Sequence, residues 1–323
     1  MASTAAQFVE IATMTISKYS KKLANNVLQS NALFGKLYDK KRIVSGGKDL
    51  QFSIKYKENT NVMSFKDYDK LVIDATEQFC EAKYDWAAYN VAIVFSDFEM
   101  AKNSGEERMM DLIKSRIQAA EEDLTNRLND DLYLDGTGND NKNILGLAAL
   151  VADTPTTGIV GGIDRAVDTW WQSKYKVATG AWGSATNLYG RKDTDYLFTT
   201  IRVGKSVPDL MLMGSYAFRG LKAELESVER GNTDFKARKN WGFVDLNFNG
   251  MDGVYDEACP AGKEYLINTD YMQLTVHNQY NFKPIPAQRP DDQASFVQHI
   301  RTFLQLTTDR SAAHGVITGI TAA

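Results

Sequence analysis

The chain has 323 residues, 43% of them hydrophobic, and is long enough to bury one large core or two adjoining ones. Its mean hydropathy is -0.36 and it contains no apolar run of membrane-spanning length, so no membrane partner is expected. Two cysteines, Cys80 and Cys259, are too few for a disulfide framework and suit a reducing compartment. No basic start followed by an apolar segment is visible, so we expect no signal peptide.

Charge is unevenly distributed along the chain. Residues 1–48 carry eight Lys or Arg and two acidic residues, a net charge of +6, which leaves -10 for the remainder. A basic N-terminal arm on an acidic body could contact nucleic acid or an acidic neighbour, or could be an ordinary solvated helix face. No nucleic-acid-binding module accompanies the charge, which argues against sequence-specific DNA recognition.

The N-terminal third predicts a helical arm followed by a long hairpin. Residues 5–40 have apolar positions at three- and four-residue steps, which predicts a helix with one break. Residues 49–56 alternate as a half-buried strand, 58–75 read as polar, and 79–95 alternate again, with a parity change at Tyr89 that indicates a β-bulge. At roughly 3.3 Å per residue the second strand would extend about 55 Å, too far for two strands to be stable alone. The hairpin therefore needs support from the rest of the chain or from another subunit.

The clearest helix is predicted at residues 104–134. Ser96 and Ser104 each stand three residues before a glutamate, the spacing of a capping box. After the second box a single apolar stripe continues for about seven turns and ends at DGTGND. The stripe consists of Met110, Ile113, Ile117, Ala120, Leu124 and Leu128.

Residues 135–263 predict a mixed α/β region. Helices are expected near 191–204 and from Ser215, with short strands at PDLMLMG and WGFVDLNF. Long alternation returns at 264–308 and predicts the closing strands.

The stretch DLNFNGMDGVYD at 245–256 is the most suggestive of metal chemistry. Its D-x-N-x-N-G pattern runs from Asp245 to Gly250, and Asp256 takes the twelfth place of a calcium loop. Such a loop needs a helix on each side and usually closes with glutamate, whereas strands are expected here. Asn-Gly between alternating residues is also the strongest short hairpin signal. We therefore expect a strand–turn–strand with Gly250 at positive φ and no structural calcium.

Other polar candidates do not assemble into a site. GKS at 204–206 lacks the earlier glycine and the preceding strand of a phosphate loop, and the glycines at 136–138 and 158–162 lack a dinucleotide fingerprint. The histidines and cysteines are isolated, so neither a zinc set nor a nucleophile triad is expected. Adjacent tryptophans can line a binding wall but more often fill a gap between packed elements. We expect no catalytic, cofactor-binding or metal residue, and no enzyme. The residues weighed are His277, His299, His314, Trp170, Trp171, Trp182, Asp123, Asp130 and Asp131.

Taken in order, these elements resemble the Hong Kong 97-type fold of tailed-bacteriophage major capsid proteins, an α+β fold. Three stretches also look similar to phage major head proteins, and the resemblance spans nearly the whole chain. No short motif defines the family, so the resemblance rests on element order and on these stretches together. They are ILGLAALVADTPTTGIVGGIDRAVDTWW at 144–171, LNFNGMDGVYDEACPAGKEYLINTDYM at 246–272 and RTFLQLTTDRSAAHGVITGI at 301–320.

The resemblance implies a division of the chain into four parts. Residues 1–48 would form the N-terminal arm, and 49–95 an extended β-hairpin loop that overlaps a neighbouring subunit. Residues 96–134 and 264–323 would form the peripheral domain, with the long helix as its spine. Residues 135–263 would form a mixed α/β axial domain at fivefold and sixfold positions.

The resemblance also implies a function and partners. The protein would be a structural protein that self-assembles as hexamers and pentamers into an icosahedral head shell. The shell would contact packaged double-stranded DNA without sequence preference, and would reach the virion after assembly in the host cytoplasm. The chain runs directly into its arm helix, so a separate scaffolding protein is expected, together with a portal. Lys57, Lys66 and Lys70 lie in the loop, but lysines at a strand edge are normally solvated, so no isopeptide cross-link is expected.

Two alternatives remain open on sequence alone. An encapsulin-type compartment has the same fold and encloses a cargo enzyme. A metal-dependent enzyme built on residues 245–256 belongs to a different class, and a monomeric, calcium-sensitive protein would favour it.

Overall fold

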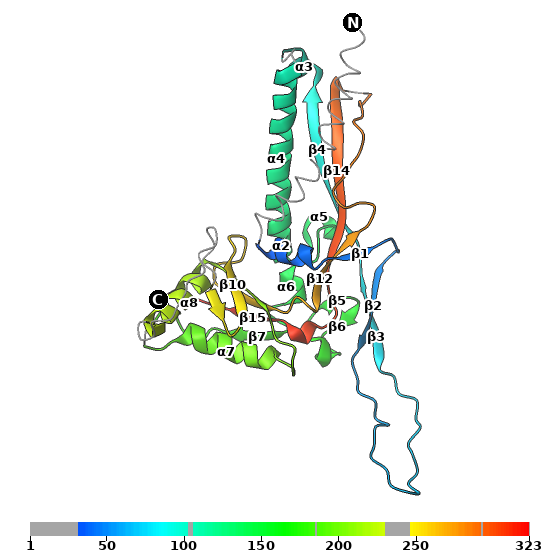
Figure 1. The fold of residues 1–323 in the computed structure, drawn as a ribbon, viewed down its shortest axis with the longest axis vertical. Helices are drawn as coiled ribbons and strands as arrows, with labels where there is room; N and C mark the ends of the chain where they lie inside the picture. Colours follow the sequence, from blue (N-terminus) through cyan, green and yellow to red (C-terminus); the bar gives the residue numbers. More distant parts are fainter. Residues whose placement is uncertain (1–31, 103–105, 185, 230–245, 292, 323) are drawn as a thin grey trace.

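The computed structural model describes residues 32–102, 106–184, 186–229, 246–291 and 293–322. Figure 1 shows a tall column with a long helix beside long strands, a lateral body that carries further helices, and a hairpin. The hairpin projects in the direction opposite to the column. The elongated shape therefore separates the column, the lateral body and the hairpin.

The column is a five-stranded sheet covered by the long helix α4 (Glu106–Tyr133), which packs against β4. β4 pairs along its whole length with β14, and the remaining strands follow the order β1-β12-β14-β13. The expected apolar stripe is buried from Ile117 to Leu128, while Met110 and Ile113 fall outside the described side chains. The strands are β1 (Arg42–Val44), β4 (Ala87–Ser96), β12 (Met272–His277), β13 (Lys283–Pro284) and β14 (Ser295–Thr308).

The lateral body is a six-stranded sheet in the order β7-β15-β11-β8-β10-β9. Alternate residues of β8 enter two cores. Met211 and Met213 pack in the cluster that includes the helices, whereas Leu210 and Leu212 pack in the cluster shared with the column. The elements are β7 (Lys174–Val177), α7 (Tyr189–Ile201), β8 (Leu210–Met213), α8 (Ser215–Glu229), β9 (Leu246–Phe248), β10 (Met251–Tyr255), β11 (Glu264–Ile267) and β15 (Gly315–Thr318).

A buried carboxylate joins the two helices of the lateral body. Glu224 of α8 accepts the N–H groups of Gly190 and Arg191 at 3.1 and 2.9 Å, at the N-terminus of α7. An anion is favourable there because the first N–H groups of a helix have no partner within it. The contact therefore satisfies a buried charge and a helix end together.

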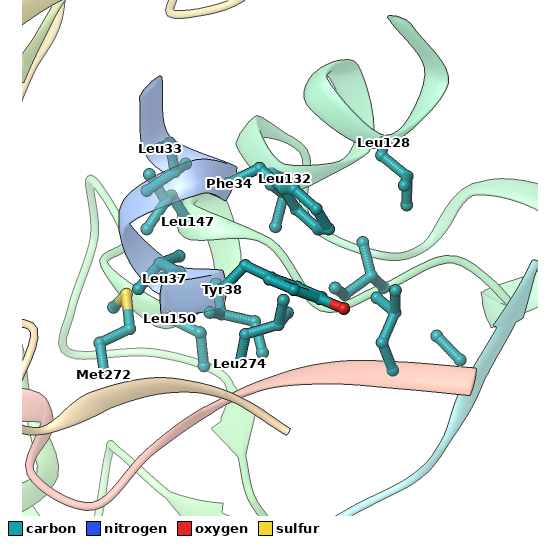
Figure 2. Close-up of a cluster of buried hydrophobic side chains, with 14 of the residues drawn as sticks. Leu33, Phe34, Leu37, Tyr38, Leu128, Leu132, Leu147, Leu150, Met272 and Leu274 are labelled. Carbon is teal, nitrogen blue, oxygen red and sulfur yellow. The ribbon is translucent and has the colours of Figure 1, made fainter. Parts of the chain in front are cut away.

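The described part of the N-terminal arm is the helix α2 (Ala32–Asp39), which lies in the core. Figure 2 shows its apolar side chains among those of α4, α6 (Leu147–Leu150) and β12. Burying a large apolar side chain contributes about 1.5–3 kcal/mol as an upper estimate, so α2 is held firmly. The buried side chains of α2 are Leu33, Phe34, Leu37 and Tyr38.

Part of the basic charge of the arm contacts acidic groups of the same chain. Lys36 pairs with Asp252 at 2.8 Å, and Lys40 pairs with Asp270 at 3.2 Å. Both pairs are largely exposed, so they orient α2 more than they stabilise it.

Short elements connect the larger parts. The Oγ of Ser96 accepts the N–H of Phe98 at 3.3 Å, so Ser96 caps α3, while Glu99, its partner in the first predicted capping box, lies outside the described side chains. Ser104, in the second box, lies outside the described residues. The connecting elements are α3 (Asp97–Lys102), α5 (Gly138–Asn141), β5 (Ile159–Val160), β6 (Ile163–Asp164), and the 3-10 turns η1 (Thr169–Trp171) and η2 (Ser311–Ala313).

The single strand predicted at 79–95 is wrong, because the structure has two strands there. β3 (Phe79–Tyr84) pairs with β2 (Leu50–Lys55), after which the chain crosses to β4 in the column. Burial changes parity at this crossing, from Tyr84 to Ala87, and not at a β-bulge at Tyr89. A change of sheet and a bulge both shift parity by one residue, so the sequence pattern alone does not separate them.

The strands expected beside the long helix at 264–308 divide between the two sheets. β12 and β14 belong to the column, whereas β11 lies between β15 and β8 in the lateral body. Alternation predicts a strand but not the sheet that it joins. The helix predicted at 5–40 lies outside the described residues up to residue 31, and α2 accounts for its end.

Candidate functional site

The β2–β3 hairpin is anchored at its base. Its inward side chains are buried, with Leu50 opposite Tyr84 and Phe52 opposite Ala82. The Tyr84 hydroxyl donates to the carbonyl of Thr308 at 3.0 Å, at the end of β14. These contacts fix the direction in which the hairpin leaves the body.

The anchorage ends at Tyr56 and Gln78. The Tyr56 N–H donates to the Gln78 carbonyl at 3.0 Å, and the Tyr56 ring stacks on Trp170 with a centroid distance of 5.2 Å. Beyond this rung lies the tip, residues 57–77. Within the described chain, the hydrogen bonds of the tip stay inside the hairpin, such as Asn61 Nδ2 to the Asp74 carbonyl at 2.6 Å. The tip therefore depends on the body only through its two ends.

The tip exposes large apolar side chains. Tyr68 is 101% exposed, Ile73 is 89% exposed and Val62 is 82% exposed. Clustered apolar exposure of this kind marks an interaction surface in a soluble protein. The other exposed apolar side chains of the tip are Met63, Phe65, Leu71 and Val72.

The prediction that residues 58–75 are polar is wrong, because this stretch contains the exposed apolar side chains of the tip. The apolar residues of the tip follow neither a period of two nor one of 3.6, so periodicity gave no signal. Counting large apolar residues in a segment without periodicity would have found them. The lysines considered for a cross-link, Lys57, Lys66 and Lys70, are exposed on the same tip.

Residues 246–255 form the expected strand–turn–strand. Met251 pairs with Phe248 across the turn. Asn249 and Gly250 have φ of +51° and +84°, the signature of a two-residue hairpin turn with both central residues left-handed. The prediction of a positive φ at Gly250 is confirmed.

The carboxylates of the same stretch serve separate contacts. Asp252 pairs with Lys36 of α2, whereas Asp256 is buried and accepts the Tyr133 hydroxyl of α4 at 2.9 Å. Asp245 lies outside the described residues. The two described carboxylates therefore hold different elements together instead of converging on one point.

The remaining sequence candidates lie apart from one another. His314 is fully buried, and its Nδ1 accepts the Asn268 N–H at 3.3 Å; burial lowers the pKa of His314 to about 3. His277 packs edge-on against Trp86, and GKS follows α7 with Gly204 at a φ of +62°. Among the described residues no three His, Cys, Asp or Glu side chains gather to hold a metal, and no helix is suited to crossing a membrane.

The tryptophans fill gaps between packed elements. Trp171 is buried, and its Nε1 donates to the Val160 carbonyl at 3.0 Å. Trp170 supports the hairpin through Tyr56, and Trp182 is buried in the second core. The pair therefore fixes the base of the hairpin.

A buried acid lies inside the lateral body. One oxygen of Glu264 accepts the Thr194 hydroxyl at 3.0 Å, and the other has no hydrogen-bond partner among the described residues. Burial raises the pKa of Glu264 to about 8, and nearby Asp193 acts in the same direction. Because the side chain is fully buried, it can affect the stability of the fold but cannot meet a substrate from solution.

No protein-family model and no curated protein matches the sequence. Solved structures do match. The capsid of cyanophage A-1(L) aligns with a TM-score of 0.65 and 18% identity over 87% of this chain and 90% of that chain. The capsid of Myoviridae phage XM1 aligns with a TM-score of 0.54 and 11% identity over 85% and 87%. The chain has the Hong Kong 97-type fold.

Other shells have the same Hong Kong 97-type fold. The SrpI encapsulin of Synechococcus elongatus PCC 7942 aligns with a TM-score of 0.55 and 12% identity over 88% of this chain and 87% of that chain. The alignments cover most of both chains, so they compare whole subunits. The expected α+β fold class is confirmed, while the fold alone does not select the contents of a shell.

Proposed function

We propose that this chain is the major capsid protein of a tailed bacteriophage. It is a structural protein that self-assembles as hexamers and pentamers into the icosahedral head shell around double-stranded DNA. The observation that carries the proposal is the exposed apolar tip at residues 57–77 on a Hong Kong 97-type subunit. A repeated head-to-tail contact between identical subunits would bury such a tip on each neighbour and close a ring.

The division expected from the sequence supplies a role for each part. The hairpin, within residues 49–95, overlaps the neighbouring subunit. The column, built from 96–134 and part of 264–323 together with β1 and β4, is the peripheral domain with α4 as its spine, so residues 87–95 belong to it and not to the hairpin. The lateral body, built mainly from 135–263, is the axial domain that clusters at fivefold and sixfold positions. Residues 1–48 form the arm.

The proposal includes partners beyond the chain itself. A separate scaffolding protein guides assembly, a portal occupies one vertex, and the basic arm contacts packaged DNA without sequence preference. Assembly takes place in the host cytoplasm, and the mature protein resides in the virion. The role is structural and not enzymatic.

Assembly is the first test. The chain expressed with its scaffold should sediment at moderate salt as particles of megadalton size, and negative-stain images should show closed shells. A chain that stays monomeric with and without scaffold overturns the proposal.

An encapsulin-type compartment is the second candidate, because an encapsulin aligns over 88% of this chain. The TM-scores do not separate the two, since the encapsulin at 0.55 lies between the cyanophage capsid at 0.65 and the phage XM1 capsid at 0.54. The preference for a viral shell rests on the three stretches similar to phage major head proteins. The contents of particles from the native source separate the two: DNA and a portal vertex support a phage head, and a cargo protein supports a compartment. The metal-dependent enzyme has less support, since Asp252 and Asp256 serve separate contacts.

A further inference from the structure

A pocket of about 450 Å³ lies beside the base of the hairpin. Its walls come from the end of β3, the β5–β6 hairpin and residues 135–152. Arg165, just after β6, also lines it, although its side chain is only 1% exposed. Arg165 therefore borders the cavity while almost all of its side chain is enclosed.

The charge of Arg165 has no counter-ion in the described chain. Its Nη2 donates to the Leu150 carbonyl at 2.6 Å, at the end of α6, while its Nε has no hydrogen-bond partner there. None of the carboxylates described lies within ion-pair distance of Arg165. A buried charge without a partner costs more than one hydrogen bond to a carbonyl returns.

The pKa of Arg165 reflects the same lack of a counter-ion. Burial lowers the pKa of Arg165, and the interaction that opposes this effect comes from Tyr84. The Tyr84 hydroxyl is itself neutral, because burial raises its pKa. The Tyr84 hydroxyl therefore supplies a dipole and not the missing negative charge.

The carboxylates near Arg165 either accept hydrogen bonds from other groups or lie at the exposed rim of the pocket. Asp164 accepts the Ala166 N–H at 2.9 Å within its own turn. Asp85 and Asp135 line the pocket but are exposed, and neither raises the pKa of Arg165. The inner wall of the pocket is therefore cationic, while solvent screens the acids at its rim.

We propose that this pocket binds an oxyanion, a carboxylate or a phosphate, which neutralises Arg165. A guanidinium presents a planar fork of donors that matches two oxygens of one carboxylate. Two sources supply this chemistry: a free anion, and an Asp or Glu side chain of a neighbouring copy. The second source rests on the proposed function.

Acetate is the probe for the unassembled chain. The melting temperature of the wild-type chain is measured as a function of sodium acetate concentration, with sodium chloride added to keep the ionic strength constant. We expect a saturable rise of several degrees. Arg165→Met removes this response, and Arg202→Met keeps it, since Arg202 is exposed and its Nε donates to a carbonyl, that of Gly204 at 3.4 Å.

In sodium chloride, the direction in which Arg165→Met shifts the melting temperature separates an anion site from a purely structural arginine. Met fills much of the same volume without a charge, so Arg165→Met should melt at or above the wild-type temperature in chloride. An arginine that only caps Leu150 predicts a lower melting temperature and the same acetate response in both proteins, and this result overturns the proposal. If Arg165→Met does not fold, acetate titrated calorimetrically into the wild-type chain decides, and absence of saturable binding overturns the proposal.

Assembled particles distinguish the two sources. If a neighbour's carboxylate fills the pocket, acetate leaves the melting of wild-type particles unchanged and Arg165→Met lowers the yield of particles. If the anion is free, acetate raises the melting of particles and Arg165→Met assembles normally. A wild-type chain that binds acetate but never assembles refutes the proposed function and leaves the anion site standing.

Discussion

The α2 core and the hairpin tip use similar side chains in opposite ways. In the α2 core, Phe34 and Leu37 are fully buried among residues of α4, α6 and β12 (Figure 2). In the tip, Phe65 is 66% exposed and Ile73 is 89% exposed. Hydrophobicity alone therefore does not locate the core of this chain, because one apolar group is buried within the chain and the other is left for a partner.

The physical reason lies in the number of layers. Apolar side chains are buried when a second layer of structure covers them, as α4 covers the column. The tip at residues 57–77 contains no strand or helix and is covered by no second layer, so its apolar side chains stay in water until another surface arrives. Each Å² then removed from water contributes about 25 cal/mol, less the entropy lost on association. Stability of the subunit and stability of the assembly should therefore respond to different substitutions.

The largest effect is expected from Leu124→Asp on α4. Leu124 is 4% exposed, so the substitution places a charge within the core of the column, at a cost of several kcal/mol. We expect insoluble protein, measured as the soluble fraction after expression. A soluble variant that assembles would show that this face of α4 is not a core.

The same chemical change in the tip should leave the subunit folded. Ile73→Asp removes an exposed apolar side chain, and deletion of residues 58–72 removes most of the surface, so either should abolish assembly with little change in the melting of the monomer. Thr60→Asp, at an exposed polar position of the same tip, is the matched control and should assemble. Sedimentation and thermal melting check both points, and normal assembly of the deletion variant contradicts the role of the tip.

A smaller, pH-dependent effect is expected in the lateral body. The folded chain holds the proton of Glu264 up to a pKa of about 8, whereas the unfolded chain releases it near the ordinary value of 4.5. The proton on Glu264 therefore makes its full contribution to the free energy of unfolding below about pH 4.5, and this contribution is lost as pH rises through about 8. Glu264→Gln stays neutral and should be more stable than wild type by a few kcal/mol at about pH 9.

Melting curves across this pH range check the prediction. Glu257→Gln, at an exposed carboxylate close in sequence, is the control and should follow the wild type. If Glu264→Gln loses stability with rising pH as the wild type does, another group titrates in this window.

The local pattern of apolar and polar residues predicts most of the strands and helices of the fold. The alternation of Leu50, Phe52 and Ile54 gives a strand with alternating burial, and the stripe through Leu124 gives the buried face of α4. Each depends on neighbours within a few residues, which periodicity records. The turn at Gly250 follows from local backbone chemistry in the same way.

The rest depends on contacts that are distant in sequence. The crossing after Tyr84 is decided by pairing of β4 with β14, about two hundred residues later, and β11 joins the lateral sheet through β8 and β15. The burial of Arg165 arises from elements that periodicity treats separately. Neither the tip nor the pocket has a motif, because both are defined by what the fold leaves uncovered.

The smallest effects are expected at the turn of residues 246–255. No atom lies within 4 Å of the position that a Cβ would occupy at Gly250, but its φ of +84° is unfavourable for a β-branched residue. Gly250→Val should therefore destabilise by about 1–3 kcal/mol through the backbone alone. Asp252→Asn loses only an exposed pair with Lys36 and should change stability by less than about 1 kcal/mol.

Calcium provides the last comparison at this turn. Because Asp252 and Asp256 hold different elements, particles should melt at the same temperature with calcium and with a chelator. The measurement is thermal melting of assembled particles in both conditions, with Asp252→Asn as the matched variant. A fall of many degrees in chelator that Asp245→Ala abolishes would show instead that this stretch is a metal clip, and that its resemblance to a calcium loop outweighs the strands on either side.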